Sequence, residues 1–110
     1  MTPVLGDELG DGPDDAHRDD GLAAALEIIG PRWALLIVDA LLQKPKRYGD
    51  LHRELGIPTN ILATRLKELE AAGVIARILL FHNSRAYTIT ERGRGLQDAV
   101  DALSDWGRSR

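Results

Sequence analysis

The sequence predicts a mainly α protein with a small β-hairpin, folded as a winged helix-turn-helix. Three observations lead to this prediction. Residues 47–73 place a short amphipathic helix, a turn that contains glycine and a longer helix with a polar face one after another. Two short runs suited to β-strands follow and end at Thr90. Apolar stripes near both ends of residues 21–107 predict N- and C-terminal helices that form a dimer interface.

Length and composition limit the chain to one modest domain. Of its 110 residues, 44% are hydrophobic and 28% are charged, as in ordinary globular proteins. The longest apolar run, residues 33–38, is far too short to cross a bilayer, and the N-terminus lacks a basic signal region. We therefore expect a cytoplasmic protein with no membrane partner. The absence of cysteine excludes disulfides and thiolate metal sites, and we expect no cofactor or metal.

Charge is distributed unevenly, which changes how the net charge of −3 is interpreted. Residues 1–20 hold seven acidic residues against one arginine, so the remaining 90 residues carry a net charge of +3. Within residues 44–94, ten Lys and Arg face five Asp and Glu. We predict a disordered acidic tail over 1–20, because it has almost nothing to bury, and a basic folded domain over 21–107. The tail is interpreted as a solubilising segment, with competition for the basic surface as the alternative.

Two helices are predicted before the helix-turn-helix. Asp20 can cap the first, which ends at Gly30. Pro31 suits the first turn of the second, over residues 32–42, whose apolar residues recur at helical spacing. This second helix is predicted to be the central helix of the core. Its Trp33, and Trp106 near the C-terminus, are expected to pack in the core rather than to line a ligand pocket.

The third and fourth helices form the predicted helix-turn-helix. Leu51 and Leu55 mark the buried face of the third, and Gly56 can adopt the left-handed backbone of a sharp turn. The fourth helix starts near Pro58 or Thr59, runs to residue 72 and is closed by glycine. Its buried stripe is predicted to consist of Leu62, Leu66 and Leu69.

The opposite face of the fourth helix carries the side chains that we expect to contact DNA. Asn60 can pair with adenine, Thr64 can contact a thymine methyl, and Lys67 can reach guanine or phosphate. A polar face opposite leucines is also what any solvated helix presents, so the preceding helix and turn favour the DNA interpretation. Arg65, at the edge of the leucine stripe, reaches either a phosphate or a charge such as Glu68 or Glu70. The predicted DNA-binding residues are Arg47, Thr59, Asn60, Ala63, Thr64, Arg65, Lys67, Ser84 and Arg85.

A β-hairpin, the wing, is predicted over about residues 76–90. Residues 74–81 fit one strand and 86–90 a second, with a turn at 82–85. In a winged protein this hairpin lies over a minor groove or a phosphate strand, and Arg85 has the charge and length to insert there. An exposed hairpin charge is the alternative for Arg85. His82 is interpreted as a turn residue rather than a ligand.

A helical stripe closes the chain and needs an apolar partner. Its residues recur at i, i+4, i+7 and i+10, and are Leu96, Val100, Leu103 and Trp106. Packing onto its own domain is one possibility. We favour pairing with the first helix, through Leu22 and Leu26, and with a second copy of the chain. The predicted twofold homodimer would bind a palindrome, because its two helices lie one turn of DNA apart.

Four stretches together resemble the HxlR-type winged-helix regulators, relatives of the MarR group. They are LEIIGPRWALLIVDALL (26–42), KRYGDLHRELGIPTNILATRLKELEAAGVI (46–75), YTITERG (87–93) and LSDWG (103–107), and the resemblance covers about residues 22–107. It implies a homodimeric transcription factor that binds double-stranded DNA. By position, Asn60, Ala63, Thr64 and Lys67 would face bases or backbone, Arg47 and Arg65 phosphates, and Arg85 the wing contact.

The resemblance also bears on how such a regulator would be controlled. The family often has a cysteine just before the first helix, which in some members senses oxidants or electrophiles. Asp20 stands at that position here. A thiol mechanism is therefore excluded, and any small-molecule effector is unidentified.

Two other classes of function compete with the DNA-binding regulator. An enzyme is not expected, because His17, His52 and His82 are scattered and residues 93–95 lack the strand-to-helix context of a phosphate loop. A winged-helix module that binds only proteins is the remaining alternative. The basic segment argues against it, and charge reversal at Lys67 and Arg85 would separate the two. We expect a repressor, because a small dimer can act by occupying a promoter.

Overall fold

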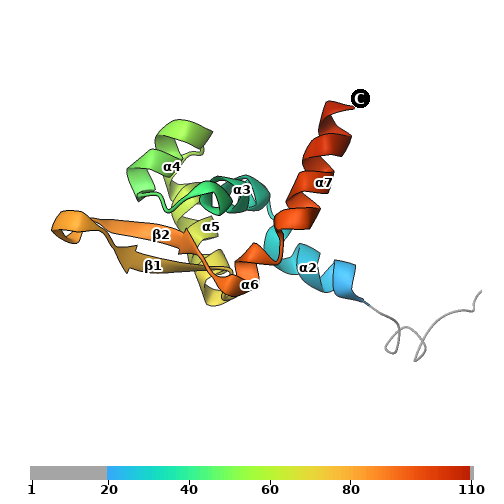
Figure 1. Ribbon diagram of the computed structural model, residues 1–110, viewed down its shortest axis with the longest axis horizontal. Helices are drawn as coiled ribbons and strands as arrows, with labels where there is room; N and C mark the ends of the chain where they lie inside the picture. The colour runs from blue at the N-terminus through green and yellow to red at the C-terminus, as the bar shows by residue number, and fades with distance from the viewer. Residues whose placement is uncertain (1–19, 110) are drawn as a thin grey trace, which may run out of the picture.

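The computed structural model describes residues 20–109, which form a mainly helical fold with one β-hairpin (Figure 1). The predicted fold class is confirmed. The disordered tail was predicted over residues 1–20. Of these, residues 1–19 lie outside the described residues, and only Asp20 is described. In chain order the elements are α2 (Gly21–Ile29), α3 (Ala34–Gln43), α4 (Tyr48–Leu55), α5 (Thr59–Ala71), β1 (Ile75–Leu79), a 3₁₀ turn (Phe81–Asn83), β2 (Arg85–Ile89), α6 (Glu91–Arg94) and α7 (Gln97–Arg108).

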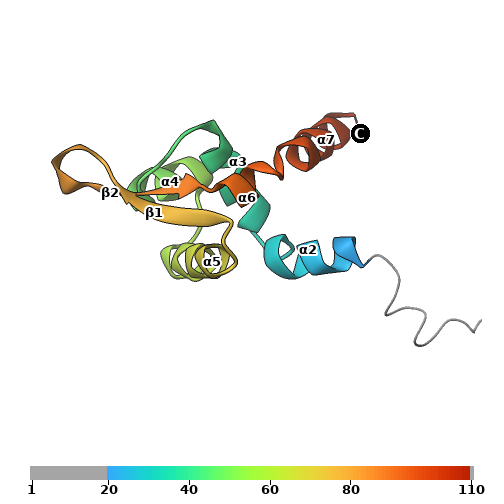
Figure 2. The same ribbon diagram turned by 60° about the horizontal axis from the view of Figure 1, so that its bottom comes forward.

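Helix α3 is the centre of the core, as predicted. Its Ile37, Val38 and Leu41 are fully buried, and α3 contacts α2, α4, α7 and β2. The leucine stripe of α5 belongs to the same buried cluster, together with the inner ends of the hairpin strands. Figure 2 shows α5 on one side of the hairpin, while α2 and α7 extend away from the end of the molecule that carries the wing.

The start of α3 differs from the prediction. Trp33 has a left-handed backbone with φ of 80°, so α3 begins at Ala34, and Pro31 lies in the preceding turn. An α-helix cannot include a residue in this conformation. The indole is half-buried against the core, as predicted, and the Arg32 guanidinium lies over its ring. Asp20 does precede α2, but its side chain makes no cap hydrogen bond.

The hairpin is antiparallel, with Ile75 opposite Ile89 and Leu79 opposite Arg85. The predicted turn at 82–85 is therefore shifted, since Arg85 already belongs to β2 and the chain reverses at the 3₁₀ turn. Lys46 forms an isolated β-bridge with β2, because its backbone N–H and C=O both bond to Tyr87. Its ammonium group is buried and lies 2.5 Å from the Glu54 carboxylate.

The C-terminal region forms two helices rather than the single one that was predicted. Thr90 caps α6 by accepting the Gly93 N–H at 3.0 Å. The N–H groups of Gly95 and Leu96 then bond three residues back, which tightens the chain and separates α6 from α7. Among the described residues, no single helix is long and apolar enough to span a membrane. Helices α2 and α3 meet that criterion only when taken together, and they meet at 84°.

Candidate nucleic-acid interface

The helix-turn-helix is closed by contacts from α4 to the beginning of α5. Gly56 ends α4 in the left-handed conformation, with φ of 70°, as the sequence predicted. Ile57 is fully buried, and its carbonyl oxygen lies 3.0 Å from Nδ1 of His52. The Tyr48 hydroxyl donates to the Thr59 carbonyl at 2.7 Å. These contacts fix the first turn of α5 relative to α4.

The predicted residues of α5 share one exposed face. Its members are Thr59, Asn60, Ala63, Thr64 and Lys67, all exposed, and the leucine stripe lies buried on the other side. The Thr64 hydroxyl donates to the Asn60 carbonyl at 3.0 Å and keeps its acceptor capacity. The side chains of Asn60 and Lys67 have no hydrogen-bond or ion-pair partner among residues 20–109. Both can therefore bind an external group without breaking an internal contact.

Arg47 lies at the start of α4 in a small charged cluster. Its backbone N–H donates to Asp50 Oδ2 at 2.9 Å, and its guanidinium and that of Arg53 also pair with this carboxylate. The Arg47 N–H, and then the Arg47 guanidinium, hold the pKa of Asp50 below its ordinary value of 3.8. Arg47 is about half-exposed and retains unused N–H donors for a phosphate.

Arg65 lies differently from the other predicted residues, because its guanidinium already has internal partners. Nε donates to the Arg32 carbonyl at 2.9 Å, and a terminal nitrogen pairs with Glu68 at 3.1 Å. The pair with Glu68, one of the two alternatives that the sequence left open, is present in the structure, and contact with a phosphate stays a prediction. Arg65 thus connects α5 to the turn between α2 and α3.

Of the two predicted wing residues, Ser84 lies in the turn and Arg85 is the first residue of β2. The Ser84 backbone closes the turn: its N–H donates to Phe81 and its carbonyl accepts from Leu80. Arg85 is exposed and has no side-chain partner within the described part of the chain. The sequence-based prediction missed the apolar end of the wing, where Leu79, Leu80 and Phe81 are exposed. Three consecutive apolar residues before a turn were a signal, but they were assigned to the first strand.

The predicted dimer residues fall into two groups. Val100 is buried and Leu96 half-buried within the protomer, so the first turns of α7 pack on the chain's own core. The second group is exposed and consists of Leu22 and Leu26 on α2, with Leu103 and Trp106 on α7. The prediction that Trp106 packs in the core is wrong for the protomer, since 72% of its surface is exposed. The end of α7 projects beyond the body that would otherwise cover it (Figure 1).

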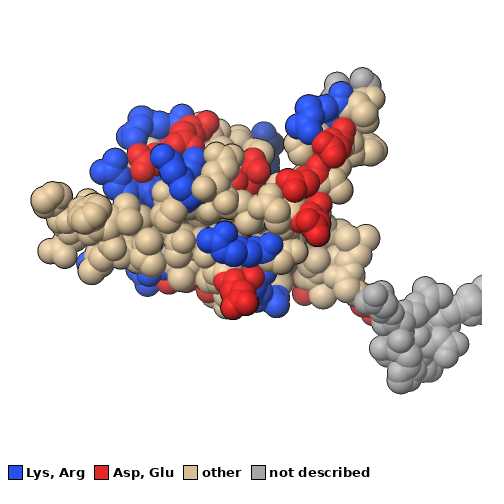
Figure 3. Space-filling view, viewed as in Figure 1, with Lys and Arg blue, Asp and Glu red and all other residues tan. Residues whose placement is uncertain are grey.

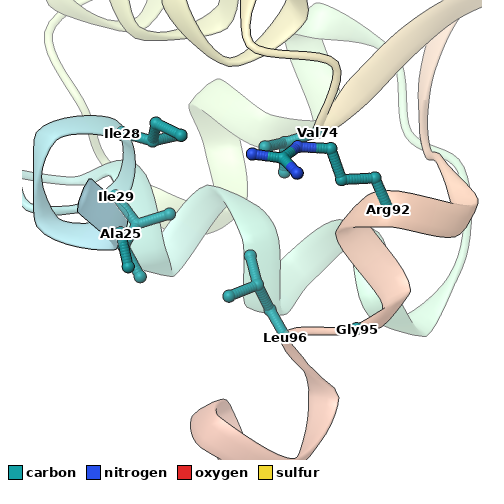
Figure 4. A pocket seen from close by; sticks show the side chains of 7 residues that line it. All are labelled: Ala25, Ile28, Ile29, Val74, Arg92, Gly95 and Leu96. Atoms are coloured by element: carbon teal, nitrogen blue, oxygen red, sulfur yellow. The ribbon is translucent and has the colours of Figure 1, made fainter. Parts of the chain in front are cut away.

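A small cavity lies between α2, α6 and the start of β1. It has a volume of about 220 Å³ and is lined by Ala25, Ile28, Ile29, Val74, Arg92, Gly95 and Leu96. The Arg92 side chain extends across it toward Ile28 (Figure 4). Its Nε donates to the Ala72 carbonyl at 3.2 Å. Among the described residues, no cluster of three or more His, Cys, Asp or Glu could hold a metal ion.

The helix-turn-helix with its hairpin defines the class of winged-helix transcriptional regulators, and comparison with known proteins agrees. The model of the HxlR-like helix-turn-helix family matches residues 28–110, so the chain belongs to this family. The resemblance inferred from the sequence is confirmed. The family and the relatives described next are transcriptional regulators, not enzymes.

Several relatives support this assignment. An uncharacterized HTH-type transcriptional regulator of Mycobacterium tuberculosis is 38% identical over 96 residues, which are 84% of this chain and 61% of the relative. The chain thus spans about three fifths of that relative's length. YodB of Bacillus subtilis is 33% identical over 88 residues, covering 77% of this chain and 79% of YodB.

Solved structures agree with the fold. That of the HTH-type regulator YtcD has a TM-score of 0.73 at 36% identity, covering 80% of this chain and 93% of YtcD. Reduced YodB of B. subtilis has a TM-score of 0.72 at 32% identity, covering 81% of this chain and 90% of YodB. The chain therefore has the helix-turn-helix domain of this family.

Proposed function

We propose that the chain is a homodimeric repressor that binds a palindromic DNA operator, with α5 in the major groove and the wing alongside. The observation that supports this most strongly is the exposed face of α5. Asn60 and Lys67 stand there without internal partners among the described residues, on a helix whose first turn is held by Tyr48. Such a face supplies the donors and acceptors that distinguish base pairs in the major groove.

The proposed contacts follow from position. Asn60, Ala63, Thr64 and Lys67 face base edges or the adjacent backbone. Thr59 and Arg47 contact phosphates, Arg47 from the start of α4. Ser84 and Arg85 act from the wing. The Arg65 guanidinium binds the Arg32 carbonyl and Glu68. We therefore assign Arg65 to orienting α5 and not to binding a phosphate.

Homodimerisation is proposed from the exposed apolar side chains of α2 and α7. Leu22 is 74% and Trp106 72% exposed, and Leu26 and Leu103 are also exposed. Side chains of this size, gathered on two helices at one end of a protomer, favour an interface with a second copy. A dimer doubles the number of phosphate contacts and places two α5 helices in successive major grooves. Repression then requires only that the dimer occupies a promoter.

Selection of binding sites from a random duplex pool tests this function. We expect enrichment of an inverted repeat whose half-sites lie about 10 base pairs apart, centre to centre. Lys67→Glu and Arg85→Glu should abolish binding to the selected duplex. Arg108→Glu, a charge reversal at the end of α7, is the matched control and should bind like the wild type. A pool with no enriched sequence would contradict the proposal and favour a module that binds only proteins.

A small-molecule effector is proposed for the cavity next to α2. A structure of quinone-bound YodB has a TM-score of 0.71 at 31% identity, covering 84% of this chain and all of that one. This chain contains no cysteine, so an effector would bind without forming a thiol adduct. The cavity lies between α2 and the base of the wing, so its occupant would touch the proposed dimer helix and residues 74 and 92, which lie just before and just after the hairpin. Quinone added to the protein–DNA complex tests one candidate: a fall in affinity that Arg92→Ala prevents supports the site, and no change excludes quinones there.

A further inference from the structure

The outer end of the wing is apolar and exposed. Leu79, Leu80 and Phe81, here called the apolar tip, follow one another, and Phe81 is 89% and Leu79 64% exposed. The hairpin projects from the body at the end opposite α7 (Figure 1), and its outermost surface carries neither cations nor carboxylates in Figure 3. Single exposed apolar residues are common on proteins. Three in succession at the end of a projecting hairpin are not.

Hydrogen bonds across the turn hold the backbone on either side of Phe81. The Leu80 N–H donates to the Ser84 carbonyl at 2.7 Å, and the Ser84 N–H donates to Phe81 at 3.3 Å. Between them His82 and Asn83 both adopt left-handed backbone, with φ of 61° and 60°. His and Asn tolerate this conformation better than most residues, but it still costs free energy. The chain therefore maintains a specific tight turn that presents the phenyl ring outward.

Cations border the apolar tip. Arg85 lies directly opposite Leu79 in the hairpin register and has no side-chain partner among the described residues. Arg77 lies two positions before Leu79 on the same face of β1, and its Nε bonds to Glu70 of α5 at 3.0 Å. The tip thus combines an apolar projection with an unpaired cation beside it. An apolar projection beside a cation is complementary to a narrow groove with anionic edges.

We propose that Phe81 is a wedge that enters the minor groove next to the sequence bound by α5, unstacks a base step and bends the DNA. This inference rests on the proposed function and deepens it, because it assigns the insertion to Phe81 rather than to Arg85. The minor groove is about 6 Å wide, which admits an aromatic ring edge-on, and phosphates line its rims. Apolar wedges that separate base steps bend duplexes by about 20–90°. Arg85 then pairs with a phosphate at the rim.

Resonance energy transfer between dyes at the two ends of a duplex measures the bend. The duplex is one that the wild-type chain selects from a random pool. Transfer is compared for the free duplex and for duplex saturated with wild type, Phe81→Leu or Phe81→Ser. We expect transfer to rise with wild type and with Phe81→Leu, because leucine also acts as a wedge, and to stay near the free-duplex value with Phe81→Ser. Since Phe81 is exposed, all three proteins should unfold at the same temperature.

Arg85→Ala supplies the control for the charge beside the wedge. It should keep the bend at saturation while the slope of log K against log salt falls by about 0.9 per protomer. Equal bending by wild type and Phe81→Ser would overturn the wedge and leave the DNA-binding function intact. The wedge would also be overturned if Arg85→Ala removed the bend and Phe81→Ser did not. Failure of the wild type to select any duplex would overturn the proposed function, and the wedge with it.

Discussion

The Arg65 guanidinium donates to the carbonyl oxygen of Arg32 at 2.9 Å, and so joins residues 33 positions apart in the chain. Arg65 lies on α5, and Arg32 lies in the turn between α2 and α3. Since α2 carries exposed leucines of the proposed dimer interface, this bond connects that region to the proposed recognition helix. In the proposed dimer, the position of α2 relative to α5 would therefore set the distance between the two recognition helices.

The first prediction concerns Arg65. Arg65→Ala should lower the free energy of unfolding by about 1 kcal/mol, because the Arg32 carbonyl and Glu68 lose their partner. Its affinity for the selected duplex should fall, while the slope of log K against log salt stays at the wild-type value, because no phosphate contact is lost. Urea unfolding and anisotropy at several salt concentrations measure both. A slope reduced by about 0.9 per protomer would mean that Arg65 contacts a phosphate after all.

The second prediction separates the roles of Asn60 and Lys67. Asn60→Ala should weaken the base preference at one base pair of each half-site. The free energy of binding to a duplex with the preferred base should become less favourable by about 1–3 kcal/mol. This variant should leave the salt slope unchanged. Lys67→Ala should weaken binding to selected and scrambled duplexes alike if Lys67 contacts phosphate, and only to the selected duplex if it contacts guanine. Neither change should affect stability, because both side chains are exposed. Unaltered binding by both variants would contradict a role for this face.

The third prediction tests the proposed dimer. Leu26→Asp places a charge among exposed leucines of α2 and should convert the protein to a monomer, measured by sedimentation equilibrium. Leu80→Asp is the matched control, because Leu80 is exposed to a similar extent but lies on the wing. It should remain a dimer. Wild type that sediments as a monomer would contradict the proposal directly.

The fourth prediction follows from the depressed pKa of Asp50. The carboxylate stabilises the start of α4 while it is ionised, and its folded pKa lies below its ordinary value of 3.8. Its contribution is therefore complete above that value and is lost as the pH falls through the folded pKa. Asp50→Asn should be less stable than wild type near neutral pH, and the difference should shrink below about pH 4. A difference independent of pH in urea titrations would show that the charge does not contribute.

The fifth prediction compares two glycines. A Cβ at Gly93 would lie 2.3 Å from the Val74 carbonyl oxygen, which is backbone and cannot move aside. Gly93→Ala should cost about 3 kcal/mol of stability and displace α6 from the hairpin. Gly107, in α7, has open space where the Cβ would stand, so Gly107→Ala should stabilise the helix by up to about 1 kcal/mol. Thermal unfolding distinguishes the two, and equal effects would contradict the packing described for Gly93.

Sequence patterns predicted those parts of the fold that depend on local periodicity. The leucines of α5, the left-handed turn at Gly56 and the core position of α3 all follow from spacing between near neighbours. What the patterns missed depends on contacts between distant segments. The β-bridge at Lys46 forms only because Tyr87 lies beside it, 41 positions further on.

The same distinction applies to the candidate site. The exposed face of α5 was predictable because it is the complement of a leucine stripe. Glu68 was foreseen as a partner of Arg65, but the Arg32 carbonyl was not, because it lies 33 positions away in the chain. The first strand of the wing ends two positions earlier than predicted and the second begins one position earlier, which places Phe81 in the exposed turn. Periodicity locates a strand but not the residue at which the chain reverses direction. That residue depends on the left-handed backbone of His82 and Asn83.

The central claim is sequence-specific DNA binding, and fluorescence anisotropy tests it most directly. The purified protein is titrated with DNA from the intergenic region beside its own gene and with a scrambled duplex. Each titration is repeated at several salt concentrations. We predict tighter binding to the native duplex and, with both duplexes, a fall of log K against log salt of about 0.9 per phosphate contact. Equally weak binding to the native and the scrambled duplex, and equally weak binding to a duplex selected from a random pool, would contradict a sequence-specific DNA-binding regulator.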